Sequence, residues 1–535
     1  MDRRCRPHAA LGSPSGRHRL HAGQASTPAT PGGTRYHCSV VPEERIVKSS
    51  NDPDGNRLPI KLDSTSNGEF EPIPLAHYHR LANRLARDAA NDNARRLAWS
   101  RRRFMVSTCG AATALMAMNT AYAAVGKTGG RFVLPPEAAL DPAAAGAALD
   151  GGEFIFDVQG HFVNPTGAWV KTLPDTATPL SFTRSEDRCV AAGLPGRLDH
   201  LQCLGPDAFV RDIFLDSDTS LVVLSFVPST YAGEPLKIEE AAATAAIVEK
   251  LDGSHRLYLH GRVNPNQDGD LDRMDWMAEN YRIAAWKTYT QWGPDGAPGF
   301  FLDDDVGLAM IEKARVLGIR TIAIHKGLPF GPRSYQHSTC VDVGRVAKRF
   351  PDVNFLIYHA GFVTTTPEGP YDPNRSDGID ALVTAVRGAG LSGRHNVFAE
   401  LGSTWRFLMR DPDSAAHALG KLLLHVGEDN ILWGTDSIWY GSPQDQIQAF
   451  RSFQISEEFR ERFGYPEITP AIRAKIFGGN ALRIYPVPDD LLDVHHGRDR
   501  VARLREDYRE NPDPHFRTFG PKTRREFFNL RQWGG

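Results

Sequence analysis

Four apolar runs in this chain end in a side chain that can bind a metal ion. The runs at 154–161, 321–325 and 354–359 end in His161, His325 and His359, and the run at 431–436 ends in Asp436. In a barrel of parallel strands the carboxyl ends meet at one mouth, so residues far apart in sequence come together there. Imidazole and carboxylate groups are common ligands of divalent metals. The pattern predicts a divalent-metal site at the mouth of a parallel barrel.

Eight strand candidates follow one another from residue 153 onward. Most are short apolar runs, which is typical of strands buried on both faces. The expected strands are Phe154–His161, Leu221–Val227, Arg256–Val263, Ile283–Tyr289, Thr321–His325, Asn354–His359, Asn396–Leu401 and Ile431–Asp436. No glycine-rich nucleotide-binding motif follows a strand, which argues against a nucleotide-binding open sheet.

Helical patterns lie between several of these strands. Apolar residues recur at helical spacing over Asp303–Leu317 and Asp413–Val426, and a third pattern runs from Ser338 towards Phe350. The alternation predicts an α/β protein with a (β/α)8 TIM barrel. The first two strands are joined by a long loop, residues 162–220, which is interpreted either as a lid or substrate wall or as a surface insertion.

The chain outside the barrel falls into segments that differ in composition. Residues 1–99 are rich in Arg, Asn, Pro, Gly and Ser and poor in apolar runs, so we expect a disordered extension. Residues 124–152 are expected to be a linker, residues 153–486 the barrel, and residues 487–535 a C-terminal helix and tail.

Residues 100–123 have the layout of a twin-arginine export signal. Ser100-Arg101-Arg102-Arg103-Phe104 precedes an uncharged stretch that ends in Ala121-Tyr-Ala123, a small-residue cleavage pattern. The signal lies about a hundred residues into the chain, so we hypothesise that the assigned start lies upstream of the true one. We expect a periplasmic or secreted protein, with the twin-arginine translocase as a partner during export and a cytoplasmic location as the alternative.

The remaining composition restricts the partners. A formal net charge of -2 gives no electrostatic case for nucleic acid. The uncharged stretch is interrupted by Ser, Thr, Cys and Asn, so no stable membrane anchor is expected. The expected partner is a small-molecule substrate, and packing of the tail on a neighbouring subunit leaves a homo-oligomer open. Cys189 and Cys203 either pair in an oxidising compartment or remain thiols.

The ordered set of motifs resembles the amidohydrolase-related family of the metal-dependent hydrolase superfamily. The resemblance covers roughly residues 153–486. It is carried by Asp157-Val-Gln-Gly-His161, Lys287, Ile324-His325-Lys326-Gly327, Tyr358-His359-Ala-Gly361, Trp433-Gly-Thr-Asp436 and Lys475-Ile-Phe-Gly-Gly-Asn-Ala481.

The resemblance implies a His-x-His pair on the first strand, histidines on the fifth and sixth, and an aspartate on the eighth. Gln159 replaces the first histidine, and a glutamine carbonyl is a weaker ligand than imidazole. We therefore predict one divalent ion held by His161, His325 and Asp436, with a weak contribution from Gln159. Zinc is the first expectation, and manganese or another divalent ion is the alternative.

Catalytic and substrate-binding roles follow from the same resemblance. Asp436 is predicted to accept the proton of a metal-activated water, and His359 to shuttle a proton or stabilise charge. Lys287 would either bridge two metals after carboxylation or face the pocket as a cation. Arg262, Arg406 and Trp439 are further candidates for substrate binding, with structural ion pairs or packing as the competing interpretation.

Three functions remain open from the sequence. The first is a hydrolase acting on an amide, lactone or ester, and the second is a decarboxylase of an aromatic or enoic acid. The third is a non-catalytic barrel whose metal site has decayed at Gln159.

Overall fold

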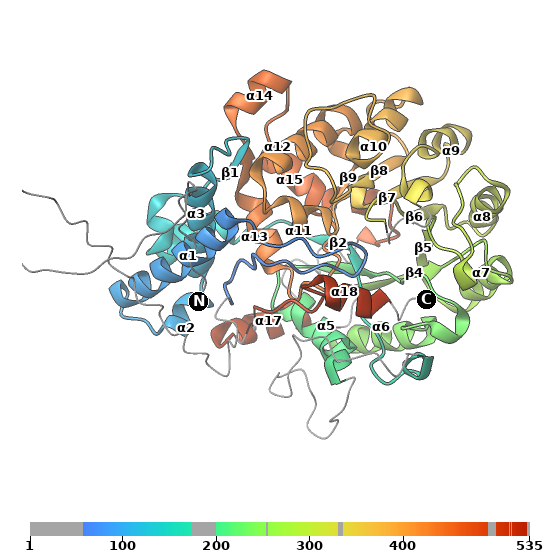
Figure 1. The fold of residues 1–535 in the computed structure, drawn as a ribbon. Coiled ribbons are helices and arrows are strands. Elements are labelled where there is room, and N and C mark those ends of the chain that lie inside the picture. The colour runs from blue at the N-terminus through green and yellow to red at the C-terminus, as the bar shows by residue number, and fades with distance from the viewer. Residues whose placement is uncertain are drawn as a thin grey trace, which may run out of the picture. The chain divides into compact units, whose positions relative to one another are not determined.

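Eight parallel strands form one sheet in the computed structural model, which describes residues 57–172, 199–252, 255–329, 335–489, 499–512, 514 and 516–531. Neighbours in the sheet are also neighbours in sequence (Figure 1). The strands are β2 Phe156–Gly160, β3 Leu221–Leu224, β4 Leu257–Arg262, β5 Ile283–Tyr289, β6 Thr321–His325, β7 Asn354–Tyr358, β8 Val397–Glu400 and β9 Ile431–Leu432.

The first and last strands of the sheet are also bonded to each other. The Val158 amide donates to the Trp433 carbonyl at 3.0 Å, and the Asp436 amide donates to the Gln159 carbonyl at 2.9 Å. A parallel bridge joins Gly160 to Ser437. The sheet therefore closes on itself, and the predicted (β/α)8 barrel is confirmed.

Helices alternate with the strands as predicted, with α8, α9 and α12 in the three expected positions. They are α5 Pro206–Val210, α6 Ile238–Asp252, α7 Asp270–Asn280, α8 Asp305–Val316, α9 Val343–Arg349, α10 Gly378–Gly388, α11 Thr404–Leu408, α12 Pro412–Lys421, α13 Gln444–Ser452, α14 Glu457–Phe463 and α15 Pro470–Ala474. Helix α5 lies within the long loop after β2, so part of that loop is regular.

Residues N-terminal to the barrel are folded from Arg57 onward. Helices α1 His77–Arg96, α2 Arg101–Met105 and α3 Thr108–Ala123 pack together beside α13, in blue and cyan in Figure 1. This corrects the expectation of disorder for residues 57–99. Helix α1 buries a stripe of small residues four apart, Ala82, Ala86, Ala90 and Ala94. Such a stripe packs well on another helix but contributes little to an apolar signal in the sequence.

The expected export signal coincides with α2 and α3. Phe104 and Leu115 have no exposed surface, whereas Arg101 and Arg102 are exposed. Among the described helices, none is both long and apolar enough to cross a membrane. The expected linker contains β1 Gly130–Phe132, which pairs antiparallel with β10 Phe453–Ile455, and α4 Pro142–Leu149.

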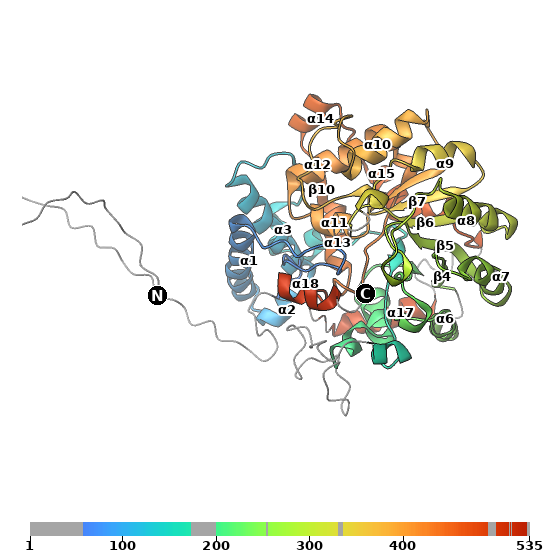
Figure 2. The same cartoon turned by 45° about the vertical axis from the view of Figure 1, so that its right-hand side comes forward.

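Residues 57–76 form an extended segment that we call the strap. It runs beside the C-terminal residues 518–522, in blue and red in Figure 2. The Ser66 amide donates to the Pro521 carbonyl at 2.9 Å, and the hydroxyls of Thr65 and Thr518 lie 2.7 Å apart.

The C-terminal region also carries two helices, α17 Arg500–Glu510 and α18 Arg524–Arg531. Asp499, at the start of α17, forms a buried ion pair with Arg256. Cys109 and Cys340 are free and buried, while Cys189 lies outside the described residues, so its pairing with Cys203 stays a prediction.

Candidate metal centre

The side chains predicted from the strand ends meet at one mouth of the barrel. His161 follows β2, His325 ends β6, His359 follows β7 and Asp436 follows β9. All four are almost completely buried, the most exposed being His161 at 3%. Five non-glycine residues at this mouth have a positive φ, among them His359 (φ 66°) and Asp436 (φ 57°), the others being Leu328, Ala360 and Ser403. Such strain often marks a functional site.

Two imidazoles face each other in the centre of this mouth. Nε2 of His359 lies 3.2 Å from Nδ1 of His325. The opposite nitrogen of each ring contacts a carbonyl: Nδ1 of His359 lies 2.7 Å from the Gly402 oxygen, and Nε2 of His325 lies 3.1 Å from the Gly327 oxygen. Those nitrogens therefore carry the protons, and each ring directs a lone pair towards the other. A hydrogen bond on the outer nitrogen is also how metal-bound histidines are oriented.

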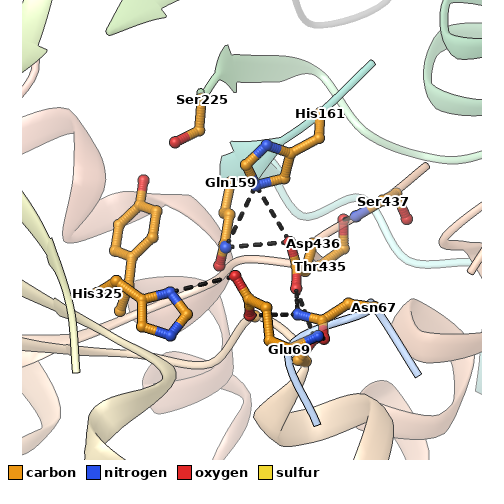
Figure 3. Close-up of polar contacts among 12 residues, drawn as sticks. Asn67, Glu69, Gln159, His161, Ser225, His325, Thr435, Asp436 and Ser437 are labelled. Carbon is orange, nitrogen blue, oxygen red and sulfur yellow. Dashed lines mark hydrogen bonds and ion pairs between the residues drawn. The ribbon is translucent and has the colours of Figure 1, made fainter. Parts of the chain in front are cut away.

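A carboxylate from the strap completes this group. Glu69 Oε1 lies 3.3 Å from His325 Nδ1, and Glu69 Oε2 lies 3.5 Å from His359 Nε2 (Figure 3 shows Glu69 beside His325). Neighbouring ligands of a tetrahedral ion with bonds of about 2.0–2.1 Å are separated by about 3.3–3.4 Å. The separation of the two imidazole nitrogens, 3.2 Å, is close to that value, and the two Glu69 oxygens lie 3.3 and 3.5 Å from one imidazole nitrogen each. Glu69, His325 and His359 therefore fit a divalent ion.

Asp436 lies next to this triad and accepts hydrogen bonds on both oxygens. Oδ1 lies 3.1 Å from His161 Nε2 and accepts from Gln159 Nε2 at 3.0 Å. Oδ2 accepts from Asn67 Nδ2 at 2.7 Å and from the Ser403 hydroxyl at 2.6 Å. Asn67 also donates to Glu69, so the strap links the two carboxylates (Figure 3).

The pKa values of the two acids at the mouth shift in opposite directions. Burial raises the pKa of Glu69, and the nearby carboxylate of Asp436 raises it further. Burial would also raise the pKa of Asp436, but hydrogen bonding and charge interaction with His161 outweigh it and lower this pKa. Asp436 is therefore held as a carboxylate. Burial lowers the pKa of His359 to about 4 and keeps it neutral, as a metal ligand must be.

Lys287 on β5 brings an ammonium group into the same interior. Its Nζ has no hydrogen-bond partner among the described residues and lies 3.7 Å from the centre of the Tyr358 ring. Burial lowers the pKa of Lys287 to about 7, although the carboxylates of Glu69, Glu400 and Asp436 act to raise it. A buried cation without a hydrogen-bond acceptor is suited to bind an anionic group of a ligand.

The two predicted arginines are engaged elsewhere. Arg262 lies 2.7 Å from Glu234 and 3.7 Å from Asp270, both acids outside the metal-binding cluster. Arg406 lies 3.0 Å from Asp63 of the strap. Both arginines therefore form ion pairs within the fold, which is the alternative to substrate binding given for them above. The Trp439 ring lies 6.2 Å from that of His161, at the edge of the mouth.

The structure thus changes the predicted grouping of the site residues. It places His359 with the ligand-like atoms and sets His161 and Gln159 around Asp436. Gln159 Oε1 has no hydrogen-bond partner in the described part of the chain. Asn67 and Glu69 were missed by sequence reasoning, because they precede the barrel by more than eighty residues. The only local signal was the turn residue Gly68, which has φ 92°.

Comparison with known proteins adds a family match. A family model described as amidohydrolase matches residues 237–487, which span β4 to β9. No curated protein matches the chain.

Solved structures resemble the chain more distantly. A 5-carboxyvanillate decarboxylase from Sphingomonas paucimobilis is 15% identical, with a TM-score of 0.39, covering 63% of this chain and 100% of its own. A dihydroxybenzoic acid decarboxylase from Polaromonas, solved with manganese, is 16% identical, with a TM-score of 0.38, covering 62% and 96%. A Pseudomonas putida protein proposed to be a 2-pyrone-4,6-dicarboxylic acid hydrolase is 12% identical, with a TM-score of 0.36, covering 62% and 97%. Likenesses this low do not identify a reaction.

Proposed function

Because residues 237–487 match a family model described as amidohydrolase, we propose that the chain is a metal-dependent enzyme that decarboxylates a small organic acid. The observation that carries metal dependence is the inward-facing triad of Glu69, His325 and His359. A divalent ion held there would polarise a substrate oxygen as a Lewis acid. Zinc and manganese both accept such a set of nitrogen and oxygen ligands.

Lys287 supports a carboxylate substrate. Its ammonium has no hydrogen-bond acceptor among the described residues and lies in the same interior as the triad. A substrate carboxylate would supply the missing acceptor and favour the charged form of the lysine. In the reaction the bond between the carboxyl carbon and its neighbour breaks, carbon dioxide leaves, and a proton takes its place on the remaining carbon.

Asp436 is the residue to move that proton. It is a carboxylate buried beside the triad, so the proton that it delivers would first pass to it from the His161 imidazole, 3.1 Å away. These groups are shielded from water, since Asp436 and His161 are 1% and 3% exposed and Asn67 of the strap donates to Asp436. Excluding water would favour carbon protonation by the protein over side reactions.

Hydrolysis is the second candidate, and a specific observation favours it. Despite burial, interaction with His161 and the Ser403 hydroxyl lowers the pKa of Asp436, so this group is ionised, as a general base that takes a proton from water must be. The substrate would then carry an amide, lactone or ester carbonyl.

Product analysis separates the two reactions. Protein loaded with zinc or manganese is incubated with a panel of aromatic and enoic acids and with a panel of lactones, esters and amides. We expect carbon dioxide from an acid, lost on chelation. Lys287→Gln should raise KM about 10–100-fold, as expected for a lost charge-assisted hydrogen bond of about 1.5–3 kcal/mol. Turnover confined to the second panel would establish hydrolysis, and absence of metal binding would support a non-catalytic barrel.

A further inference from the structure

We propose that the strap is a working part of the metal site: Glu69 supplies an anionic ligand in place of the histidine that the first barrel strand lacks at Gln159. Metal binding and docking of the strap are then one coupled equilibrium. This inference rests on the proposed metal centre and extends it beyond the barrel.

The strand β2 offers no charged ligand at this position. The amide of Gln159 is neutral, and its Nε2 points at Asp436 Oδ1, 3.0 Å away. Glu69 instead directs one carboxylate oxygen at each of the two imidazole lone pairs. The strap therefore supplies the negative charge on the side of the triad where the barrel has a neutral amide.

Specific contacts hold Glu69 in this position. Asn67 donates from one side-chain nitrogen to both Glu69 and Asp436. Further back along the strap, Asp63 pairs with Arg406 at 3.0 Å and Lys61 pairs with Asp445 at 3.0 Å. The strap is thus attached to the barrel by ion pairs at residues that flank the mouth.

The charges at the mouth also favour binding of a divalent cation. Glu69 and Asp436 are two nearly buried acids joined through one amide group, and uncompensated buried charges are costly. A divalent ion on the triad would offset both charges and hold the strap down. In its absence the strap should detach more easily.

Metal affinity of two matched variants tests the proposal. Glu69→Gln keeps the shape of the side chain and removes its charge. Glu71→Gln is the control, because Glu71 lies on the same strap but is exposed and pairs with Arg524 at 3.2 Å. Zinc and manganese affinities are measured by competition with a chelator, independently of activity. We expect Glu69→Gln to bind at least about 10–100-fold more weakly, the loss typical even for residues that only support metal ligands, and Glu71→Gln to match the unaltered protein.

Hydrogen exchange on the unaltered protein gives a second measurement that needs no variant. Bound metal should slow exchange of the backbone amides over residues 64–70. Unchanged affinity in Glu69→Gln, or unchanged exchange in the strap of protein that has bound metal, would overturn the proposal while leaving the metal centre intact. If the unaltered protein binds neither zinc nor manganese, the proposed function fails, and this inference with it.

Discussion

In the proposed function, single residues at the mouth have separate roles as metal ligand, base or anion-binding cation. The neutral imidazoles of His325 and His359 share a triad with Glu69, whereas His161 and Gln159 support Asp436. These assignments differ in what each substitution should remove, so they can be separated by metal content and turnover.

His359 is expected to behave as a metal ligand rather than only as a proton shuttle. His359→Ala should lower metal affinity about as much as His325→Ala, because both nitrogens face the same point. His260→Ala is the control, since His260 is buried in the barrel but contacts Ser225 and Tyr485 instead. The measurement is metal content after dialysis. Full metal occupancy in His359→Ala would restore the proton-shuttle role predicted from the sequence.

Gln159→Glu should make the protein more dependent on metal. The substitution keeps the shape of the side chain and places a second negative charge beside Asp436, 3.0 Å from its Oδ1. The metal-free protein should therefore unfold at a lower temperature, and the increase in Tm on adding zinc should be larger. Each tenfold gain in affinity corresponds to about 1.4 kcal/mol. An equal metal-induced increase in both proteins would count against an ion near this position.

At the scale of elements, the strap and the helices α1–α3 are the parts that sequence reasoning did not place. The barrel strands could be predicted because they are apolar on both faces, and the side chains that meet at the mouth could be predicted because they end those strands. The Asn67-Gly68-Glu69 turn has no such context: its role depends on contacts with Asp436 at a separation of 369 residues. Helix α1 was missed because alanines, rather than large apolar residues, form its buried face.

The helices α1–α3 should depend on a few large side chains set among these alanines. Leu115 on α3 has no exposed surface, so Leu115→Ala should destabilise the pair of α1 and α3 by about 2–5 kcal/mol. Hydrogen exchange across both helices reports this loss. Ile247→Ala on α6, where the side chain is 58% exposed, should change stability by less than about 0.5 kcal/mol. Slow exchange in Leu115→Ala would mean that these helices are held by other contacts.

Export through residues 100–123 remains a proposal at this scale, and it conflicts with a role for Glu69 in the exported form. Arg101→Lys with Arg102→Lys should trap uncleaved protein in the cytoplasm, because a signal that needs two guanidinium groups is not satisfied by equal charge. Fractionation and the mass of the product test this. A mature protein cleaved near Ala123 would lack Glu69 and should bind metal as weakly as Glu69→Gln. Normal processing of the double variant would exclude the signal.

At the scale of the whole molecule, ion pairs that are only partly buried connect the barrel to the segments around it. Asp218, before β3, lies 2.5 Å from Arg451 on α13 and also pairs with Arg509 on α17. Burial would raise the pKa of Asp218, but Arg451 and Arg509 outweigh it and lower the pKa to about 2.

The ion pairs of Asp218 should make the free energy of unfolding depend on pH. A carboxyl whose pKa is lower in the folded protein stabilises it above about pH 4, the unfolded pKa, and this contribution disappears as pH falls towards 2. The contribution is roughly 2 kcal/mol. Asp218→Asn should therefore reduce stability at pH 7 and flatten its decline in acid. Asp207→Asn, at an exposed position, is the control in denaturant titrations between pH 2 and 7. Parallel acid curves for Asp218→Asn and the unaltered protein would contradict this role.

The separation between Glu69 and the barrel histidines also has a consequence for the order in which the chain matures. The strap is synthesised before any barrel strand, yet it can reach its place only after the residues around Asp436 exist and the barrel has closed. Contacts of such long range form late and slowly in folding. Full metal affinity should accordingly be the last property that a newly made chain acquires, and uptake of the ion would report that the strap has docked and folding is complete.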